Sequence, residues 1–140
     1  MEREWRREMP DRAPLFNAPV FDLDGNHLFT PDLFDVAAGV LGEYNGSEHG
    51  KDGQFRRDLD REALCRRLGL ESATMMGGRD SGRDFRLRLA EAYGRAELQT
   101  GPRMWTLERP DWWVDTSTVA ARRALTPDQR AIWLRRLRRT

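Results

Sequence analysis

Two acidic residues stand at a spacing that could hold a metal ion. Asp32 is followed eleven positions later by the run Glu43-Tyr44-Asn45-Gly46. Carboxylates on adjacent strands can converge on one side of a sheet and hold a hard cation such as Mg²⁺ or Mn²⁺, which prefers oxygen ligands. The backbone carbonyl of Tyr44 could add another oxygen. Because side chains alternate along a strand, Asn45 would share the face of Glu43 and point at the metal.

Such a site has the chemistry for phosphodiester hydrolysis. A divalent cation would lower the pKa of a water molecule and stabilise the charged transition state. Asn45 is neutral, so it cannot act as a general base, and it ligates a cation more weakly than Asp. His49 or Lys51 could supply the missing proton transfer. The other interpretation of His49 is a polar residue in a glycine-rich loop. Because Asn45 itself is neutral, this position decides whether the site cleaves nucleic acid or only binds it.

A small sheet is needed to position these residues. Residues 18–23 and 27–34 are apolar, β-prone runs on either side of an Asp-Gly-Asn turn, which predicts a β-hairpin. Residues 36–44 lack polar alternation, as is typical of a strand buried on both faces. Residues 45–53 are rich in glycine and charge, and they predict a loop.

Two helices and a fourth strand follow. Residues 54–68 and 81–98 carry apolar side chains at helical spacing, and residues 70–76 predict a strand between them. The stripe of the second helix consists of Phe85, Leu89, Tyr93 and Ala96. The order β-β-β-α-β-α predicts an α/β fold in which a helix returns the chain to lay strand four beside strand three. We therefore expect a mixed sheet covered by helices.

The two ends of the chain differ from the expected core at residues 17–100. Residues 1–16 are charged, and they are expected either to form a short helix, the remainder of a truncated first helix, or to fray. Residues 101–140 form an appendage whose tryptophans (105, 112 and 113) are interpreted as buried anchors rather than base-stacking platforms. The run Thr126-Pro127-Asp128-Gln129 predicts the start of a final helix that reaches about Arg138, with apolar contacts at Ile132, Trp133 and Leu137.

A wider set of residues resembles a known family, the PD-(D/E)XK nuclease superfamily, and within it the branch similar to very-short-patch repair endonucleases. The set consists of Asp32, Glu43-Tyr44-Asn45-Gly46, His49, Arg57-Asp58, Arg61-Glu62 and Leu68-Gly69-Leu70. The resemblance covers about residues 17–96. It implies a restriction-endonuclease-like mixed sheet flanked by helices, Asp32 and Glu43 as ligands of Mg²⁺ or Mn²⁺, and DNA as the substrate.

Several positions depart from that family's pattern or carry a plainer interpretation. Asn45 stands where the family places Lys, or Asp in this branch. The family often has a glutamate on a helix before the first strand, and only Glu2, Glu4 and Glu8 precede it here. Other charged or reactive residues are expected to be structural. Arg57, Asp58, Arg61 and Glu62 are assigned to a solvated helix face, Asp35 to the side of the strand opposite Asp32, and Cys65 to a buried, inert position.

Composition limits the class of protein. With 39% hydrophobic and 34% charged residues, the 140-residue chain suits a soluble globular fold with one sizeable core. No run approaches the roughly 18 apolar residues of a membrane span, and the charged N-terminus lacks a signal-peptide core. A single cysteine excludes an internal disulfide and a Cys-based zinc site. We therefore expect a cytoplasmic protein with no membrane contact.

Positive charge is concentrated at the C-terminus. Seven arginines and one acid between Arg122 and Thr140 give a local net charge of +6. The basic segment either contacts phosphate or forms a solvated helix face. Two functions follow from these patterns. The first is a Mg²⁺-dependent DNA endonuclease acting in repair, mobile-element or defence contexts. The alternative is a catalytically inactive module of the same fold, whose basic helix binds nucleic acid or a partner protein.

Overall fold

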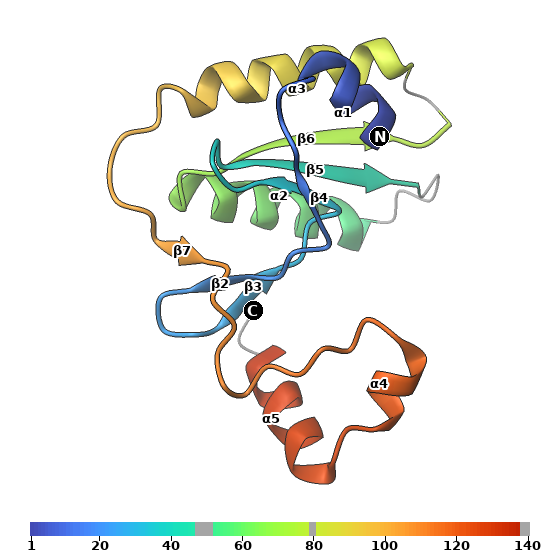
Figure 1. Ribbon diagram of the computed structural model, residues 1–140, viewed down its shortest axis with the longest axis vertical. Coiled ribbons are helices and arrows are strands. Elements are labelled where there is room, and N and C mark those ends of the chain that lie inside the picture. Colours follow the sequence, from blue (N-terminus) through green and yellow to red (C-terminus); the bar gives the residue numbers. More distant parts are fainter. Residues whose placement is uncertain (47–51, 79–80, 138–140) are drawn as a thin grey trace. The chain divides into compact units, whose positions relative to one another are not determined.

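The computed structural model describes residues 1–46, 52–78 and 81–137, which contain five helices and seven short strands (Figure 1). The helices are α1 (Glu2–Glu8), α2 (Asp52–Arg67), α3 (Gly82–Ala96), α4 (Val119–Arg123) and α5 (Pro127–Leu137). The strands are β1 (Leu15–Phe16), β2 (Val20–Asp22), β3 (His27–Phe29), β4 (Leu33–Asp35), β5 (Val40–Asn45), β6 (Glu71–Met76) and β7 (Trp105–Thr106). They confirm the mixed α/β class. The restriction-endonuclease-like fold stays a prediction. Along the described residues, none of the helices combines the length and apolar character that a membrane crossing requires.

The chain divides into two compact units. Residues 1–18 and 30–104 form the first unit, and residues 19–29 and 105–140 form the second. This division differs from the boundary expected near residue 100. The segment 19–29, which the sequence places in the core, pairs instead with β7, where Phe21 lies opposite Thr106 and Asp22 opposite Trp105.

The first unit is built on a mixed sheet in the order β1-β4-β5-β6. β4 is antiparallel to both β1 and β5, whereas β5 and β6 are parallel. The register of the parallel pair runs from Val40 opposite Glu71 to Asn45 opposite Met76. A parallel pair needs a crossover connection, and α2 provides it. The prediction that a helix returns the chain to the side of the third strand is therefore confirmed.

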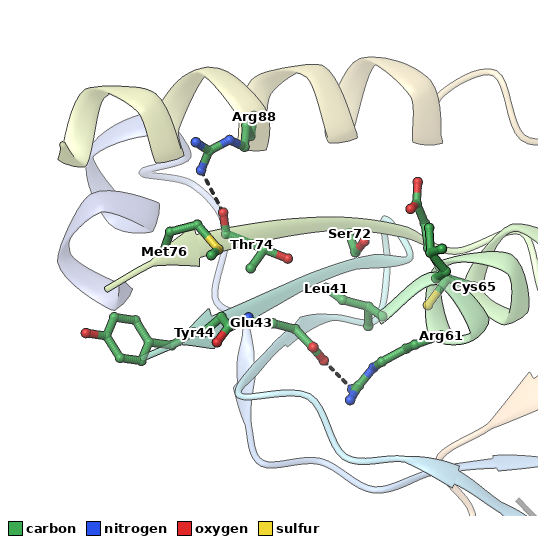
Figure 2. A pocket seen from close by; sticks show the side chains of 12 residues that line it. Leu41, Glu43, Tyr44, Arg61, Cys65, Ser72, Thr74, Met76 and Arg88 are labelled. Carbon is green, nitrogen blue, oxygen red and sulfur yellow. Dashed lines mark hydrogen bonds and ion pairs between the residues drawn. The ribbon is translucent and has the colours of Figure 1, made fainter. Parts of the chain in front are cut away.

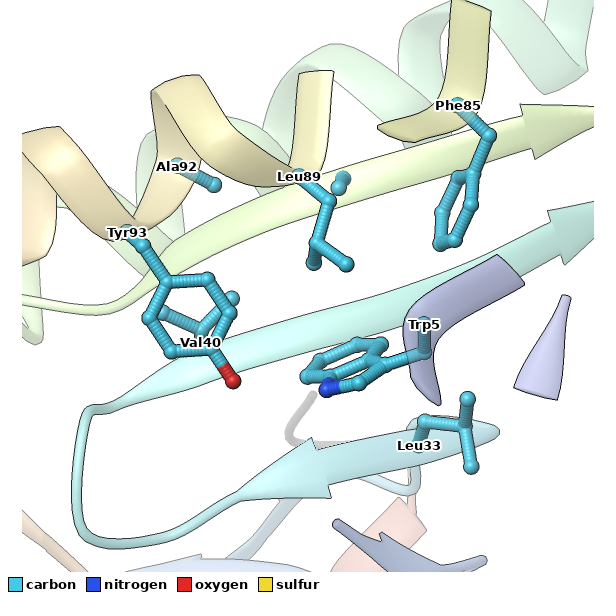
Figure 3. Close-up of a cluster of buried hydrophobic side chains, with 8 residues drawn as sticks. Trp5, Leu33, Val40, Phe85, Leu89, Ala92 and Tyr93 are labelled. Atoms are coloured by element: carbon cyan, nitrogen blue, oxygen red, sulfur yellow. The ribbon is translucent and has the colours of Figure 1, made fainter. Parts of the chain in front are cut away.

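Helices cover both faces of this sheet (Figure 1). On one face, α1 and α3 enclose a core that contains Trp5, Leu33, Val40, Phe85 and Leu89 (Figure 3). Trp5 is fully buried, and burying an aromatic side chain of that size anchors the short helix α1. The N-terminal segment is thus helical through residue 8. The opposite face carries α2, and the odd-numbered side chains of β5 point toward it.

The predicted hairpin is confirmed at its turn, but its second strand is shorter than expected. The Asp22 carboxylate accepts hydrogen bonds from the backbone of Asp24 and Asn26, and Gly25 adopts a φ of 78° between them. The expected strand 27–34 is wrong as a single element. β3 ends at Phe29 and pairs with β2, while β4 belongs to the other sheet. Pro31 lies in the break, where a residue without an N–H cannot continue a ladder.

The expected strand 36–44 is also shorter in the structure, because residues 36–39 form a turn. The Asp35 carboxylate accepts a hydrogen bond from the backbone N–H of Ala38 at 3.1 Å, and Gly39 has a φ of 71°. β5 therefore starts at Val40 and extends through Asn45, one residue beyond the predicted end. The predicted helices and strand that follow, α2, β6, α3 and α5, agree with the sequence to within two residues at each end, whereas β7 and α4 were not predicted.

The second unit combines the sheet β3-β2-β7 with α4 and α5. Its tryptophans act as packing residues, as expected. Trp105 is buried, and the rings of Trp112 and Trp113 contact Phe21 edge to face. Thr126 caps α5 through a reciprocal pair of hydrogen bonds with Gln129, so the predicted start of this helix is confirmed.

Candidate metal site and its pocket

The two predicted carboxylates come from neighbouring parts of the sheet: Asp32 directly precedes β4, and Glu43 lies in β5. Leu33 of β4 lies opposite Gly42 of β5, and extending this antiparallel register by one residue would set Asp32 opposite Glu43. Directly opposed residues share one face of a sheet. The Asp32 Oδ2 atom also accepts a hydrogen bond from the Tyr44 backbone N–H at 2.8 Å. This bond holds the exposed Asp32 carboxylate against β5.

Strand alternation sets the other candidate ligands. Glu43 and Asn45 line the same pocket on the α2 side of the sheet, as the sequence predicted (Figure 2). Tyr44 is half-exposed, and its hydroxyl lies so close to Gly77 that a Cβ there would approach it to 2.5 Å. The tyrosine ring therefore lies against the glycines that end β5 and β6. His49 and Lys51 fall outside the described residues.

Arg61 of α2 forms an ion pair with Glu43 (Figure 2). The sequence placed Arg61 on a solvated helix face with neighbouring charges, and that interpretation is wrong for this residue. Glu62 behaves as expected and pairs with Arg66 at 2.8 Å along the helix. The side chains of residues 57 and 58 lie outside the described part of the chain. Sequence reasoning missed the Arg61 contact, because the partners are eighteen residues apart and belong to different elements.

A pocket of about 580 Å³ extends from Glu43 between α2 and β6. Its walls mix apolar side chains with hydroxyl groups, including Leu41, Leu59, Ser72, Thr74 and Met76. Arg88 of α3 also lines it and donates a hydrogen bond to the Thr74 carbonyl at 2.8 Å (Figure 2). Both arginines come from helices. Arg61 belongs to the residues that resemble the nuclease family but was assigned to a solvated helix face, and no sequence pattern singled out Arg88.

Cys65 lies at the inner wall of the pocket and is almost fully buried. Burial raises the pKa of its thiol from 9.0 to about 11, because the charged thiolate loses its solvation there. A thiol with such a pKa is protonated at neutral pH and is a poor nucleophile. The expectation of a buried, inert cysteine is confirmed.

The remaining acids near the sheet serve other contacts. Asp35 lies on the face of α3, where its carboxylate accepts a hydrogen bond from the Tyr93 hydroxyl at 2.8 Å, so it faces away from the candidate site as predicted. Burial and the Asp35 carboxylate raise the pKa of Tyr93. The upstream glutamates Glu4 and Glu8 approach Arg86 of α3. These contacts give no reason to assign Glu4 or Glu8 to the candidate metal site.

The donor set fits Mg²⁺ better than a transition metal. Asp32 and Glu43 offer carboxylate oxygens and Asn45 offers a carboxamide oxygen, and Mg²⁺ is commonly bound through one or two carboxylates while keeping several waters. Within residues 1–46, 52–78 and 81–137, no group of three or more His, Cys, Asp or Glu side chains is arranged to hold a metal. Among the described residues, the candidate site therefore offers only a few protein ligands, and water would complete the coordination of the cation.

Comparisons with known proteins add no evidence about the fold or the function of this chain. No family model matches the chain, and no curated protein or solved structure matches it at a significant level.

Proposed function

We propose that this chain is a metal-dependent nuclease that hydrolyses phosphodiester bonds of DNA. The observation that carries the proposal is the hydrogen bond that holds the Asp32 carboxylate against β5 at Tyr44, next to Glu43, whose side chain lines a pocket. Asp32, directly before β4, and Glu43, in β5, would together form a hard, anionic site that solvent can reach at the exposed Asp32 carboxylate. A polymer too large to be buried, such as DNA, can reach a site of this kind.

The residues of the site have separable roles in this proposal. Asp32 and Glu43 would hold Mg²⁺ or Mn²⁺, and Asn45 would orient substrate or add a weak oxygen ligand. The cation supplies positive charge that stabilises the negative charge developing on the phosphoryl oxygens. Asn45 cannot accept a proton at neutral pH. The proposal therefore assigns proton transfer to another group, for which His49 and Lys51 remain the candidates.

Plasmid nicking tests this function. Supercoiled plasmid is incubated with Mg²⁺ or Mn²⁺ and either the wild type or Asp32→Asn. The asparagine keeps an oxygen that can accept the hydrogen bond from Tyr44 but removes the charge that attracts a cation. We expect nicking by the wild type, its loss in Asp32→Asn and Glu43→Gln, and normal activity in Asp11→Ala, which removes an exposed acid elsewhere in the first unit. Equal nicking by all four proteins would show that a contaminant cuts the plasmid.

A second candidate function follows from a different observation. Glu43 is already paired with Arg61, and Asn45 is neutral, so the site could have lost catalysis while keeping the fold. In that case the chain is a binding module that contacts nucleic acid, or a partner protein, through the arginines of α4 and α5. This alternative predicts DNA binding in EDTA that weakens steeply with salt. It is rejected if Arg130→Gln combined with Arg135→Gln leaves both the affinity and the salt slope unchanged.

A further inference from the structure

Arg61 forms an ion pair with Glu43 that differs from the ion pair between Arg66 and Glu62 of the same helix. Arg66 and Glu62 pair one turn apart along α2, with side chains 68% and 55% exposed. Arg61 instead reaches across to β5 and pairs with Glu43, with side chains 35% and 24% exposed. The reduced exposure weakens solvent screening, so this pair is more strongly coupled than an ordinary surface pair.

The partner of Arg61 is the carboxylate to which the proposed function assigns a cation. A guanidinium and a divalent cation both bind carboxylate lone pairs, so they compete for the same Glu43 oxygens. Arg61 cannot escape the competition by losing its proton, because guanidinium stays charged throughout the ordinary pH range. A guanidinium displaced from Glu43 keeps its positive charge and can bind another anion.

The charges of the site identify that anion. Asp32 and the charged side chains that line the pocket (Glu43, Glu62, Arg61 and Arg88) together carry one net negative charge. A divalent cation changes this to one net positive charge, which a single phosphodiester neutralises. If position 45 were an aspartate, the site with its divalent cation bound would already be neutral. Because Asn45 is uncharged, the metal-bound site keeps one positive charge, which Arg61 can direct to the substrate. The planar guanidinium fork also matches two oxygens of a phosphate.

We propose that Arg61 is an exchangeable counter-cation: it pairs with Glu43 in the metal-free protein and moves to the substrate phosphodiester when a divalent cation takes Glu43. In this scheme Arg61 is a substrate-binding residue that couples metal entry to DNA binding. The inference rests on the proposed function, because it requires Glu43 to be a metal ligand.

Two binding measurements on Arg61→Gln test the exchange, with Arg66→Gln as a control that removes the same charge from the same helix. Calorimetry with Mn²⁺ should show binding about fivefold tighter than in the wild type, since the competing cation is gone. Fluorescence anisotropy with a short DNA duplex in Ca²⁺ should show binding about tenfold weaker, since a charge-assisted contact to phosphate is lost. Arg66→Gln should match the wild type in the Mn²⁺ titration and lose less DNA affinity than Arg61→Gln.

The opposite signs of the two effects separate exchange from a structural role. If Arg61 only orients Glu43, Arg61→Gln binds Mn²⁺ more weakly or with unchanged affinity, and the inference is overturned. Unchanged DNA affinity overturns it as well. If Arg61→Gln does not fold, Arg61→Lys serves instead: it keeps the charge but not the fork, so Mn²⁺ affinity should stay near that of the wild type while DNA affinity falls. Failure of the wild type and every variant to bind Mn²⁺ would instead remove the proposed function on which the inference rests.

Discussion

Gly42 lies in β5 directly beneath the indole of Trp5, and this contact makes a quantitative test of the core. A Cβ atom on Gly42 would lie 2.6 Å from Cζ3 of Trp5 and 3.3 Å from Cβ of Leu33. Trp5 is fully buried in the core cluster that contains Leu33, Phe85 and Leu89 (Figure 3). Gly42→Ala must therefore displace the indole or bend β5.

The expected cost is that of overpacking a well-filled core, about 1–3 kcal/mol. Gly94→Ala is the matched control, because it makes the same substitution in α3 at a site where nothing lies within 4 Å of the new Cβ. There the change should stabilise the helix by about 1 kcal/mol, since glycine is a poor helix former. The two substitutions thus differ in sign, although both add one methyl group.

Urea unfolding followed by far-ultraviolet circular dichroism measures both changes in the free energy of unfolding. The cause of the Gly42→Ala effect can be checked in a Trp5→Leu background, where the smaller side chain should relieve part of the cost. If Gly42→Ala is as stable as the wild type, or if its cost is the same with leucine at position 5, the packing of Trp5 against β5 is refuted.

Two further predictions concern pH and helix capping. The Cys65 thiol has a folded-state pKa of about 11, above its unfolded value of 9.0, so the stability linked to it is complete below pH 9 and is lost as pH rises toward 11. Urea unfolding at pH 7 to 10.5 should therefore show a shallower loss for Cys65→Ala, and equal slopes would contradict the burial of this thiol. Ser81 caps α3 through a reciprocal pair of hydrogen bonds with Asp84, so Ser81→Ala should cost about 1 kcal/mol while Ser81→Asn, which keeps a capping oxygen, should cost less. Thermal melting checks the order of these two variants, and equal melting temperatures in the wild type and Ser81→Ala would argue against the cap.

The elements that could be predicted from sequence are those encoded by residues close together in the chain. The stripe Phe85, Leu89 and Tyr93 identified α3, and all three side chains are buried against the sheet. Thr126 and Gln129 identified the start of α5 through a capping pattern three residues long. Periodicity and capping depend on contacts within one or two helical turns, which the sequence displays directly.

The features that escaped prediction depend on contacts distant in sequence. Membership of a sheet is decided by which strand a segment pairs with, so the break between β3 and β4 at Pro31 was not visible in a continuous β-prone run. The burial of Trp5 depends on α3, some eighty residues later in the chain. Gly39 was placed inside a strand, because apolar composition alone does not distinguish a tight turn from a buried strand.

In the candidate site, too, the contacts set by local sequence were predicted and those between distant segments were not. The common face of Glu43 and Asn45 follows from strand alternation and was predicted. The partner of Glu43 was not, because a long arginine side chain on α2 reaches it only after the helix has packed on the sheet. This unpredicted contact changes the chemistry most, since it places a positive charge where the proposed function requires a metal ion.

Calorimetric titration with Mn²⁺ tests the central claim, that Asp32 and Glu43 together form a divalent-cation site. It needs no knowledge of the substrate, and Asp32→Asn preserves an acceptor for the hydrogen bond from Tyr44 while removing the charge. We expect saturable Mn²⁺ binding by the wild type and its loss in both Asp32→Asn and Glu43→Gln, with all three proteins melting cooperatively. Wild-type protein that binds no Mn²⁺, or variants that bind it as tightly as the wild type, would show that Asp32 and Glu43 do not form a cation site.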